Sequence, residues 1–152
     1  MPIHVEIVSR EQKVFEELNA DMVLVPALEG QMGVLPRHAP TVASLGHGEL
    51  IVKKGNAQES FAIFGGVVDV RPGKVVVLAE IAASTHDIDV EAAEAARVRA
   101  QQALEKGLSE DERRMATLEL RRATLELQLV RKIKSAGSSV IRILDEDDVV
   151  EE

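Results

Sequence analysis

The residue types that most often carry chemistry are sparse in this 152-residue chain, and they are not grouped. Four histidines lie in four different segments, and no two of them have the spacing of a metal-binding pair: His4, His38, His47 and His86. The chain has no cysteine, which excludes disulfides, thiolate catalysis and thiolate zinc sites. It has neither a P-loop nor a nucleophile elbow. We therefore expect no metal site and no catalytic site.

Residues 26–40 (PALEGQMGVLPRHAP) stand out because they combine three prolines, two glycines and apolar residues. An ordinary connection between strands and a contact surface for a partner explain this composition equally well. An enzyme would need a catalytic cluster here, such as His38 with Glu29. Two such residues without a third partner do not form an acid, base and nucleophile set.

The segment that must position these residues is predicted to be a sheet. All five prolines and eight of the ten glycines precede residue 74, among about seven short apolar runs. Turn signals at Lys54-Gly55-Asn56 and Arg71-Pro72-Gly73 separate some of these runs, and the second suits a type II turn. Gly65-Gly66 indicates a bulge or a close backbone approach. Residues 1–85 are therefore predicted to form an antiparallel β-sandwich or flattened barrel.

Residues 86–136 are predicted to form an antiparallel two-helix hairpin. Asp87 or Asp89 caps a first, alanine-rich helix that runs to about Lys106, with Gly107 as a left-handed end residue. Ser109 and Glu112 form a capping box for a second helix that runs to about Ala136. Its apolar residues Met115, Leu118, Leu125 and Leu129 are expected to pack on the alanines of the first helix.

The same helix carries many basic residues, which form either a solvated face or a contact for an acidic partner. The hairpin packs on itself or on the sandwich, or it detaches and docks elsewhere, since a two-helix hairpin is marginal alone. Residues 137–152 form a tail that ends in an acidic run. This tail is either a solvated end or a segment that folds back onto the basic second helix.

Composition excludes further classes of protein. The formal net charge is −8 and aromatic residues make up 2% of the chain, which argues against a nucleic-acid-binding surface. The sequence shows no secretory signal and no apolar run of about 18 residues that could span a bilayer. The hydrophobic fraction of 45% is ordinary for a globular protein, and the core must be mainly aliphatic.

Three stretches resemble the epsilon subunit of bacterial F-type rotary ATP synthases. They are residues 25–50 (VPALEGQMGVLPRHAPTVASLGHGEL), 62–70 (AIFGGVVDV) and 75–80 (VVVLAE). The first is similar to the family pattern P-x-x-x-G-x-x-G-[IV]-[LY]-P-G-H-A-P-L-x-x-x-L-x-x-G. The order of a sandwich followed by two helices also agrees, so the resemblance covers about residues 2–136.

The resemblance implies a non-catalytic rotor subunit in the central stalk. Such a subunit couples proton-driven rotation to ATP synthesis, and its hairpin inhibits ATP hydrolysis. The implied partners are the gamma subunit, the c-ring and the alpha/beta catalytic head, with the chain a monomer in the assembly. The implied location is peripheral, on the cytoplasmic face of the plasma membrane, reached only through the complex. A free-standing adaptor that binds some other protein is the alternative.

The resemblance also assigns contacts residue by residue. The loop contacts to gamma and the c-ring would come from Glu29, Gly30, Gln31, Met32, Gly33, Val34, Leu35 and His38. Gln31 would face the ring and His38 would face gamma. Contacts of the hairpin with the head would come from Arg114, Arg121, Arg122 and Arg131. Gln31 replaces a frequent acidic residue. Arg37 replaces a frequent glycine, so either its φ is positive or the turn differs.

Some family members bind ATP in the hairpin, and this chain has a degraded form of their motif. The matching residues are Ile88, Asp89, Ala93 and Arg122. Ala92 replaces the motif arginine and Glu126 stands where a second-helix arginine is expected. Two lost cations and one added carboxylate weaken the binding of a polyanion, so we expect weak or no ATP binding and no other cofactor. Arg97 or Arg99 would be the residues to compensate.

Overall fold

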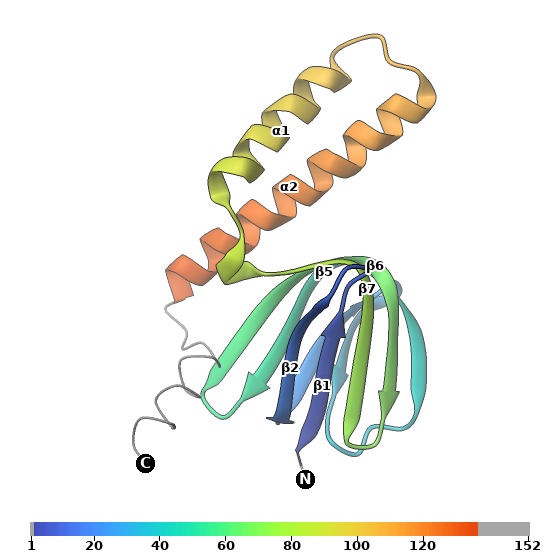
Figure 1. Ribbon diagram of the computed structural model, residues 1–152, viewed down its shortest axis with the longest axis vertical. Coiled ribbons are helices and arrows are strands. Elements are labelled where there is room, and N and C mark those ends of the chain that lie inside the picture. Colours follow the sequence, from blue (N-terminus) through green and yellow to red (C-terminus); the bar gives the residue numbers. More distant parts are fainter. Residues whose placement is uncertain (1, 137–152) are drawn as a thin grey trace.

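The computed structural model describes residues 2–136, which form a seven-stranded sheet followed by two long helices (Figure 1). The predicted acidic tail, residues 137–152, lies outside the described residues. The elements are β1 (Ile3–Val8), β2 (Lys13–Ala20), β3 (Met22–Ala27), β4 (Gly30–Val34), β5 (Thr41–Lys54), β6 (Ala57–Arg71), β7 (Lys74–Ser84), the 3₁₀ turn η1 (Thr85–Asp87), α1 (Val90–Leu104) and α2 (Glu110–Ala136).

The strand order is β2-β1-β7-β6-β5-β3-β4, with β2 and β4 at the edges. The predicted antiparallel β-sandwich is confirmed, with one pair as an exception, because β1 lies parallel to β7. The cause is the β6–β7 turn, which lies beside the start of β1: the His4 amide donates to the Gly73 carbonyl at 2.9 Å. Strands β1 and β7 therefore leave the same end of the sheet in the same direction.

The long strands β5, β6 and β7 each contribute to both layers of the sandwich. In β6 the core residues Phe61 and Ile63 are odd-numbered, whereas Val68 and Val70 are even-numbered. Since side chains alternate along a strand, the inward face has changed between these pairs. The change falls at Gly65 and Gly66, with φ of +72° and +123°. The strand bends there, and the sheet closes around an aliphatic core.

Gly66 is a close backbone approach, one of the two alternatives that its sequence suggested. A β-carbon on Gly66 would lie 2.1 Å from the carbonyl oxygen of Leu78. The β5–β6 and β6–β7 registers continue through this point without a shift. Gly73 has φ +77°, as the predicted type II turn requires. Within residues 2–136 no residue other than glycine has positive φ, so the turn at Arg37 differs from a glycine turn.

The helix starts agree with their predicted caps, whereas one helix end does not. The Asp89 carboxylate accepts from the Ala92 amide at 3.1 Å, and the Ser109 hydroxyl accepts from the Glu112 amide at 3.3 Å. Helix α1 ends at Leu104, before Gly107, which is not among the glycines with positive φ. The prediction of a left-handed end residue there is therefore wrong.

The seam between the two helices consists of alanines on both sides. Ala93 and Ala100 of α1 and Ala116 and Ala123 of α2 are buried, and each pair is spaced by seven residues. Met115 and Leu118, which were expected in this seam, are 69% and 42% exposed. Small side chains on both helices allow a close approach, so the leucines of α2 turn toward other surfaces. Among residues 2–136 no helix has an apolar stretch that could cross a membrane.

Candidate functional site

The first candidate surface is the edge segment, residues 28–40, which comprises the β3–β4 turn, strand β4 and the connection to β5. Within residues 2–136, strand β4 pairs only with β3 and forms an edge of the sheet. The segment is tied at both ends: the Leu28 amide donates to Ser44, and Pro36 accepts from the Gly73 amide, both at 2.8 Å. It is thus a braced sheet edge, part strand and part connection.

The predicted contact residues occupy different depths in the edge segment. Leu35 is 58% exposed, and Glu29, Gly30, Gln31 and Gly33 are also exposed. Met32 packs half-buried against the core, and Val34 is buried within it. The side chain of Val34 therefore holds the edge in place and presents no surface to a partner.

Gln31 lies near the start of β4, and His38 lies past its end. Gln31 is next to the β3–β4 turn, whereas His38 follows β4, with its Nδ1 2.8 Å from the Ala39 carbonyl oxygen. One edge thus offers two separate polar positions. Glu29 also lies in the β3–β4 turn, at the opposite end of β4 from His38, so the structure does not bring together the acid–base pair that an enzyme would need.

The second candidate surface is the junction where α2 meets the sandwich. Its apolar part is a cluster of buried Ala62, Phe64 and Leu129, with Ile88 and Leu125 packed against it. The residues come from β6, from α2 and from the link between η1 and α1. Only the C-terminal half of α2 takes part in this cluster, and the hairpin projects from the sandwich beyond it (Figure 1).

A chain of polar side chains runs beside the apolar cluster. Lys132 Nζ donates to Glu49 Oε1 at 2.8 Å, and the Ser60 hydroxyl donates to Glu49 Oε2 at 2.6 Å. The Thr85 hydroxyl donates to Ser60 at 3.0 Å. This chain links α2 to β5, β6 and η1. It orients the Glu49 carboxylate toward the helix, so the docked position of α2 is specified by charge as well as by shape.

The four predicted head-contact arginines do not share one environment. Arg114, Arg121 and Arg131 are exposed, and the described part of the chain offers them no ion pair. Arg122 Nε donates to Glu126 at 2.8 Å, and its guanidinium lies 5.7 Å from the centre of the Phe64 ring. Arg122 is therefore engaged by the junction while the hairpin is docked.

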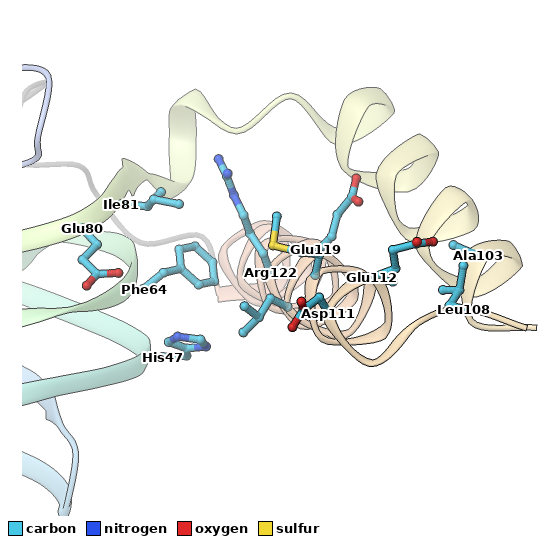
Figure 2. A pocket seen from close by; sticks show the side chains of 13 residues that line it. His47, Phe64, Glu80, Ile81, Ala103, Leu108, Asp111, Glu112, Glu119 and Arg122 are labelled. Atoms are coloured by element: carbon cyan, nitrogen blue, oxygen red, sulfur yellow. The ribbon is translucent and has the colours of Figure 1, made fainter.

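Three residues of the degraded nucleotide motif have structural roles in the hairpin and its junction. Ile88 packs in the junction cluster, Asp89 caps α1, and Ala93 is buried in the helix seam. A cavity of about 780 Å³ lies between the sheet and the hairpin (Figure 2). Four carboxylates line it, from Glu80, Asp111, Glu112 and Glu119, against one guanidinium, from Arg122. Its walls therefore repel a polyanion.

A small polar cluster lies outside both surfaces, on β1 and β2. His4 Nε2 lies 2.9 Å from a carboxylate oxygen of Glu16 and 3.3 Å from one of Glu6. Glu6 and Glu16 face each other in the β1–β2 ladder. The hydrogen bond from His4 holds the pKa of Glu16 below its ordinary value, and Lys13 acts in the same direction. The imidazole ring and the ammonium group thus both contact Glu16, which faces Glu6 across the β1–β2 ladder.

Sequence reasoning allowed the hairpin to pack on the sandwich but missed the polar residues of the junction. Glu49, Ser60 and Thr85 have no motif, and each is polar within or next to an apolar stretch. That interruption is the available signal, because a polar residue inside a strand needs a partner when it is buried. Lys132 was grouped with the basic residues of α2, and nothing in the sequence distinguishes it from Arg131 or Lys134.

Comparison with known proteins gives matches over nearly all described residues. Residues 2–85 match the family model described as ATP synthase, Delta/Epsilon chain, beta-sandwich domain, and residues 86–131 match its long alpha-helix domain. The ATP synthase epsilon chain of Halalkalibacterium halodurans is 44% identical over 128 residues, which are 84% of this chain and 96% of the relative. That of Herpetosiphon aurantiacus is 41% identical over 131 residues, 86% and 96% of the two chains.

Solved structures share the fold at lower identity. A chain in the cryo-EM structure of Euglena gracilis mitochondrial ATP synthase, OSCP/F1/c-ring, superposes with a TM-score of 0.62 at 22% identity. The match covers 89% of this chain and 81% of that one. A chain in the Tetrahymena thermophila central stalk and c-ring structure gives 0.55 at 13% identity, over 86% and 97%.

Proposed function

The chain belongs to the ATP synthase delta/epsilon family, and we propose that it is a central-stalk rotor subunit whose helical hairpin restrains ATP hydrolysis. In this proposal the subunit couples proton-driven rotation to ATP synthesis and has no catalytic residues of its own. It lies at the cytoplasmic face of the plasma membrane as a peripheral component, held there by its partners.

The observation that carries the proposal is the small junction between α2 and the sandwich. Among the described residues, its contacts are the apolar packing around Leu129, the approach of Arg122 to Phe64 and the ion pair of Lys132 with Glu49. The side chain of Lys132 is 60% exposed, and an ion pair that exposed contributes only about 0–1 kcal/mol. Contacts this limited hold a docked hairpin and still permit it to leave, which a brake that engages and releases requires.

Two different surfaces then meet different partners. The edge segment supports contacts with gamma and the c-ring, because its two polar positions are apart: Gln31 lies near the start of β4 and His38 follows its end. The exposed arginines Arg114, Arg121 and Arg131 are available to acidic residues of the catalytic head. Undocking would separate Arg122 from Phe64, while its pair with Glu126 of the same helix would remain.

The proposal extends to the cofactor. We expect the hairpin to bind ATP weakly or not at all. The cavity beside it has acidic walls, and the Arg122 guanidinium already donates a hydrogen bond to Glu126. ATP at millimolar concentration should leave the thermal midpoint of the purified chain unchanged. A midpoint that rises with ATP concentration would show binding to the folded chain and would contradict this part of the proposal.

The decisive experiment measures ATP hydrolysis by a catalytic head of the same source that lacks this subunit. The full chain should slow turnover, and a version that ends at His86 should bind without slowing it. A full-length chain with Arg121→Glu and Arg131→Glu tests the head contact in an intact hairpin and should inhibit less. If neither the full chain nor the short version binds the head, the rotor assignment fails and the adaptor alternative replaces it.

A further inference from the structure

A second groove lies between α2 and the sandwich, on the side of the edge segment. Its volume is about 680 Å³, and its apolar walls are formed by Leu28 and Leu45 of the sandwich and Leu120 and Leu125 of α2. Leu28 is 71% exposed. Arg121 and Gln128 also line the groove. The groove therefore combines apolar walls with a cationic rim, which is formed by Arg121.

The cationic rim continues along one face of α2. Arg114 precedes Arg121 by seven residues and Gln128 follows it by seven, so the three side chains share a face. Of the carboxylates near this face, Glu126 is engaged by Arg122 and Glu119 by Arg99, whereas Glu110 and Asp111 lie about one turn before Arg114. In the part of the chain that the structure describes, Arg114 and Arg121 have no ion pair. This face thus fits a ligand that is apolar at one end and acidic at the other.

The chain itself contains such a segment. The matched family domain ends at residue 131 and α2 ends at Ala136. Residues 140–144 (VIRIL) are mostly apolar, and residues 145–152 (DEDDVVEE) carry six carboxylates and no basic residue. The order is the one that the groove requires, because the apolar part comes first and lies nearer to the end of α2.

The lengths also agree. If residues 137–139 (GSS) reverse the chain, the remaining 13 residues span up to about 43 Å in extended form. Helix α2 has 27 residues, or about 40 Å. At roughly 3.3 Å per extended residue against 1.5 Å per helical residue, Ile143 comes level with Gln128. The four acidic residues 145–148 then come level with Arg121.

We propose that residues 137–152 bind in cis along this face of α2, with the apolar part in the groove and the acidic run on Arg121 and Arg114. The contact does not depend on the proposed function, because it forms within the isolated chain. It covers two of the arginines that the catalytic head would otherwise meet, so the tail competes with the head for the same cations.

The test uses the absence of cysteine, which lets two introduced cysteines report on one contact. In the full chain, Gln128→Cys with Ile143→Cys should form an intramolecular disulfide under mild oxidation. The matched control is Val130→Cys with Ile143→Cys. Position 130 is two residues along α2, so its tether length is nearly the same but it points to the other side of the helix. A bound tail should make the first disulfide at least about tenfold faster than the second, beyond the effective concentration that any tether gives.

Two further arms separate the alternatives. Arg121→Glu in the 128/143 background should slow disulfide formation toward the control rate, because it reverses the charge that the acidic run contacts. Equal rates for the 128/143 and 130/143 pairs would overturn the proposal. Disulfide-linked dimers from a mixture of the two single-cysteine chains, formed faster than the intramolecular bond, would also overturn it, since the tail of a second copy would then be the occupant.

Discussion

Gly66 is a position where the sandwich requires one particular residue type. The carbonyl oxygen of Leu78 lies 2.1 Å from the position of an added β-carbon, and φ is +123°. We expect Gly66→Ala to lower the free energy of unfolding by several kcal/mol, up to about 4, or to prevent folding, because both backbones are fixed by the β6–β7 ladder. Urea unfolding followed by circular dichroism measures the change.

Gly73→Ala provides the matched control at a turn. Its φ of +77° is also unfavourable for alanine, but nothing lies within 4 Å of the added β-carbon. This variant carries backbone strain without a clash, so its cost should be nearer to about 1 kcal/mol. Equal losses for the two variants would mean that backbone strain, and not the approach to Leu78, sets the requirement for glycine at position 66.

At the scale of elements, Leu129 tests how the hairpin is held. It is 5% exposed and packs on Ala62 and Phe64 across the junction. Leu129→Ala should weaken docking of α2 by about 2 kcal/mol, at the low end for buried leucines because the cluster is small. Hydrogen exchange should become faster in the C-terminal half of α2 and in η1, while the strands of the core keep their protection.

Leu118→Ala removes the same atoms from the same helix, but Leu118 is 42% exposed and lies outside the junction cluster. It should leave exchange at the junction unchanged, within about 0.5 kcal/mol. If both variants accelerate exchange equally, the effect comes from lost side-chain contacts along the whole helix and not from docking, since alanine has the higher helix propensity. Loss of protection throughout β5 and β6 would instead mean that the junction is part of the core of the sandwich.

The elements were largely predictable from the sequence, whereas their meeting surfaces were not. Caps at Asp89 and Ser109 fix helix starts through local hydrogen bonds, and local signals are visible in sequence. The change of inward face along β6 depends on how three long strands bend together. The exposure of Met115 depends on which face of α2 the alanines of α1 occupy. Such choices are made by packing between distant segments, which no local pattern records.

The candidate site shows the same division. The edge segment was recognisable because prolines and glycines fix its backbone, yet the core position of Val34 follows from its pairing with Val23. The Lys132–Glu49 pair joins residues 83 positions apart. Its partners are ordinary charged residues of a helix and a strand, so only the fold selects them.

At the scale of the whole molecule, the tail and the catalytic head would compete for one face of α2. If residues 137–152 cover Arg121 and Arg114, only the uncovered fraction of chains can engage the head, and the apparent affinity falls by that fraction. A chain that ends at Ala136 should therefore inhibit hydrolysis at a lower concentration than the full chain. Neutralising the acidic residues 145–148 to amides in the full-length chain should have nearly the same effect, because it removes the charge and keeps the length.

Salt dependence distinguishes this competition from a steric effect of the tail. Attraction between the acidic run and exposed arginines is screened as the Debye length shortens from about 10 Å at 0.1 M salt to about 3 Å at 1 M. At each salt concentration, the inhibitory concentration of the shortened chain is compared with that of the full chain. The difference between the two should become smaller as salt rises. An advantage that persists unchanged at high salt would mean that the tail blocks the head by its bulk. Equal inhibition by the full and shortened chains at low salt would exclude competition altogether.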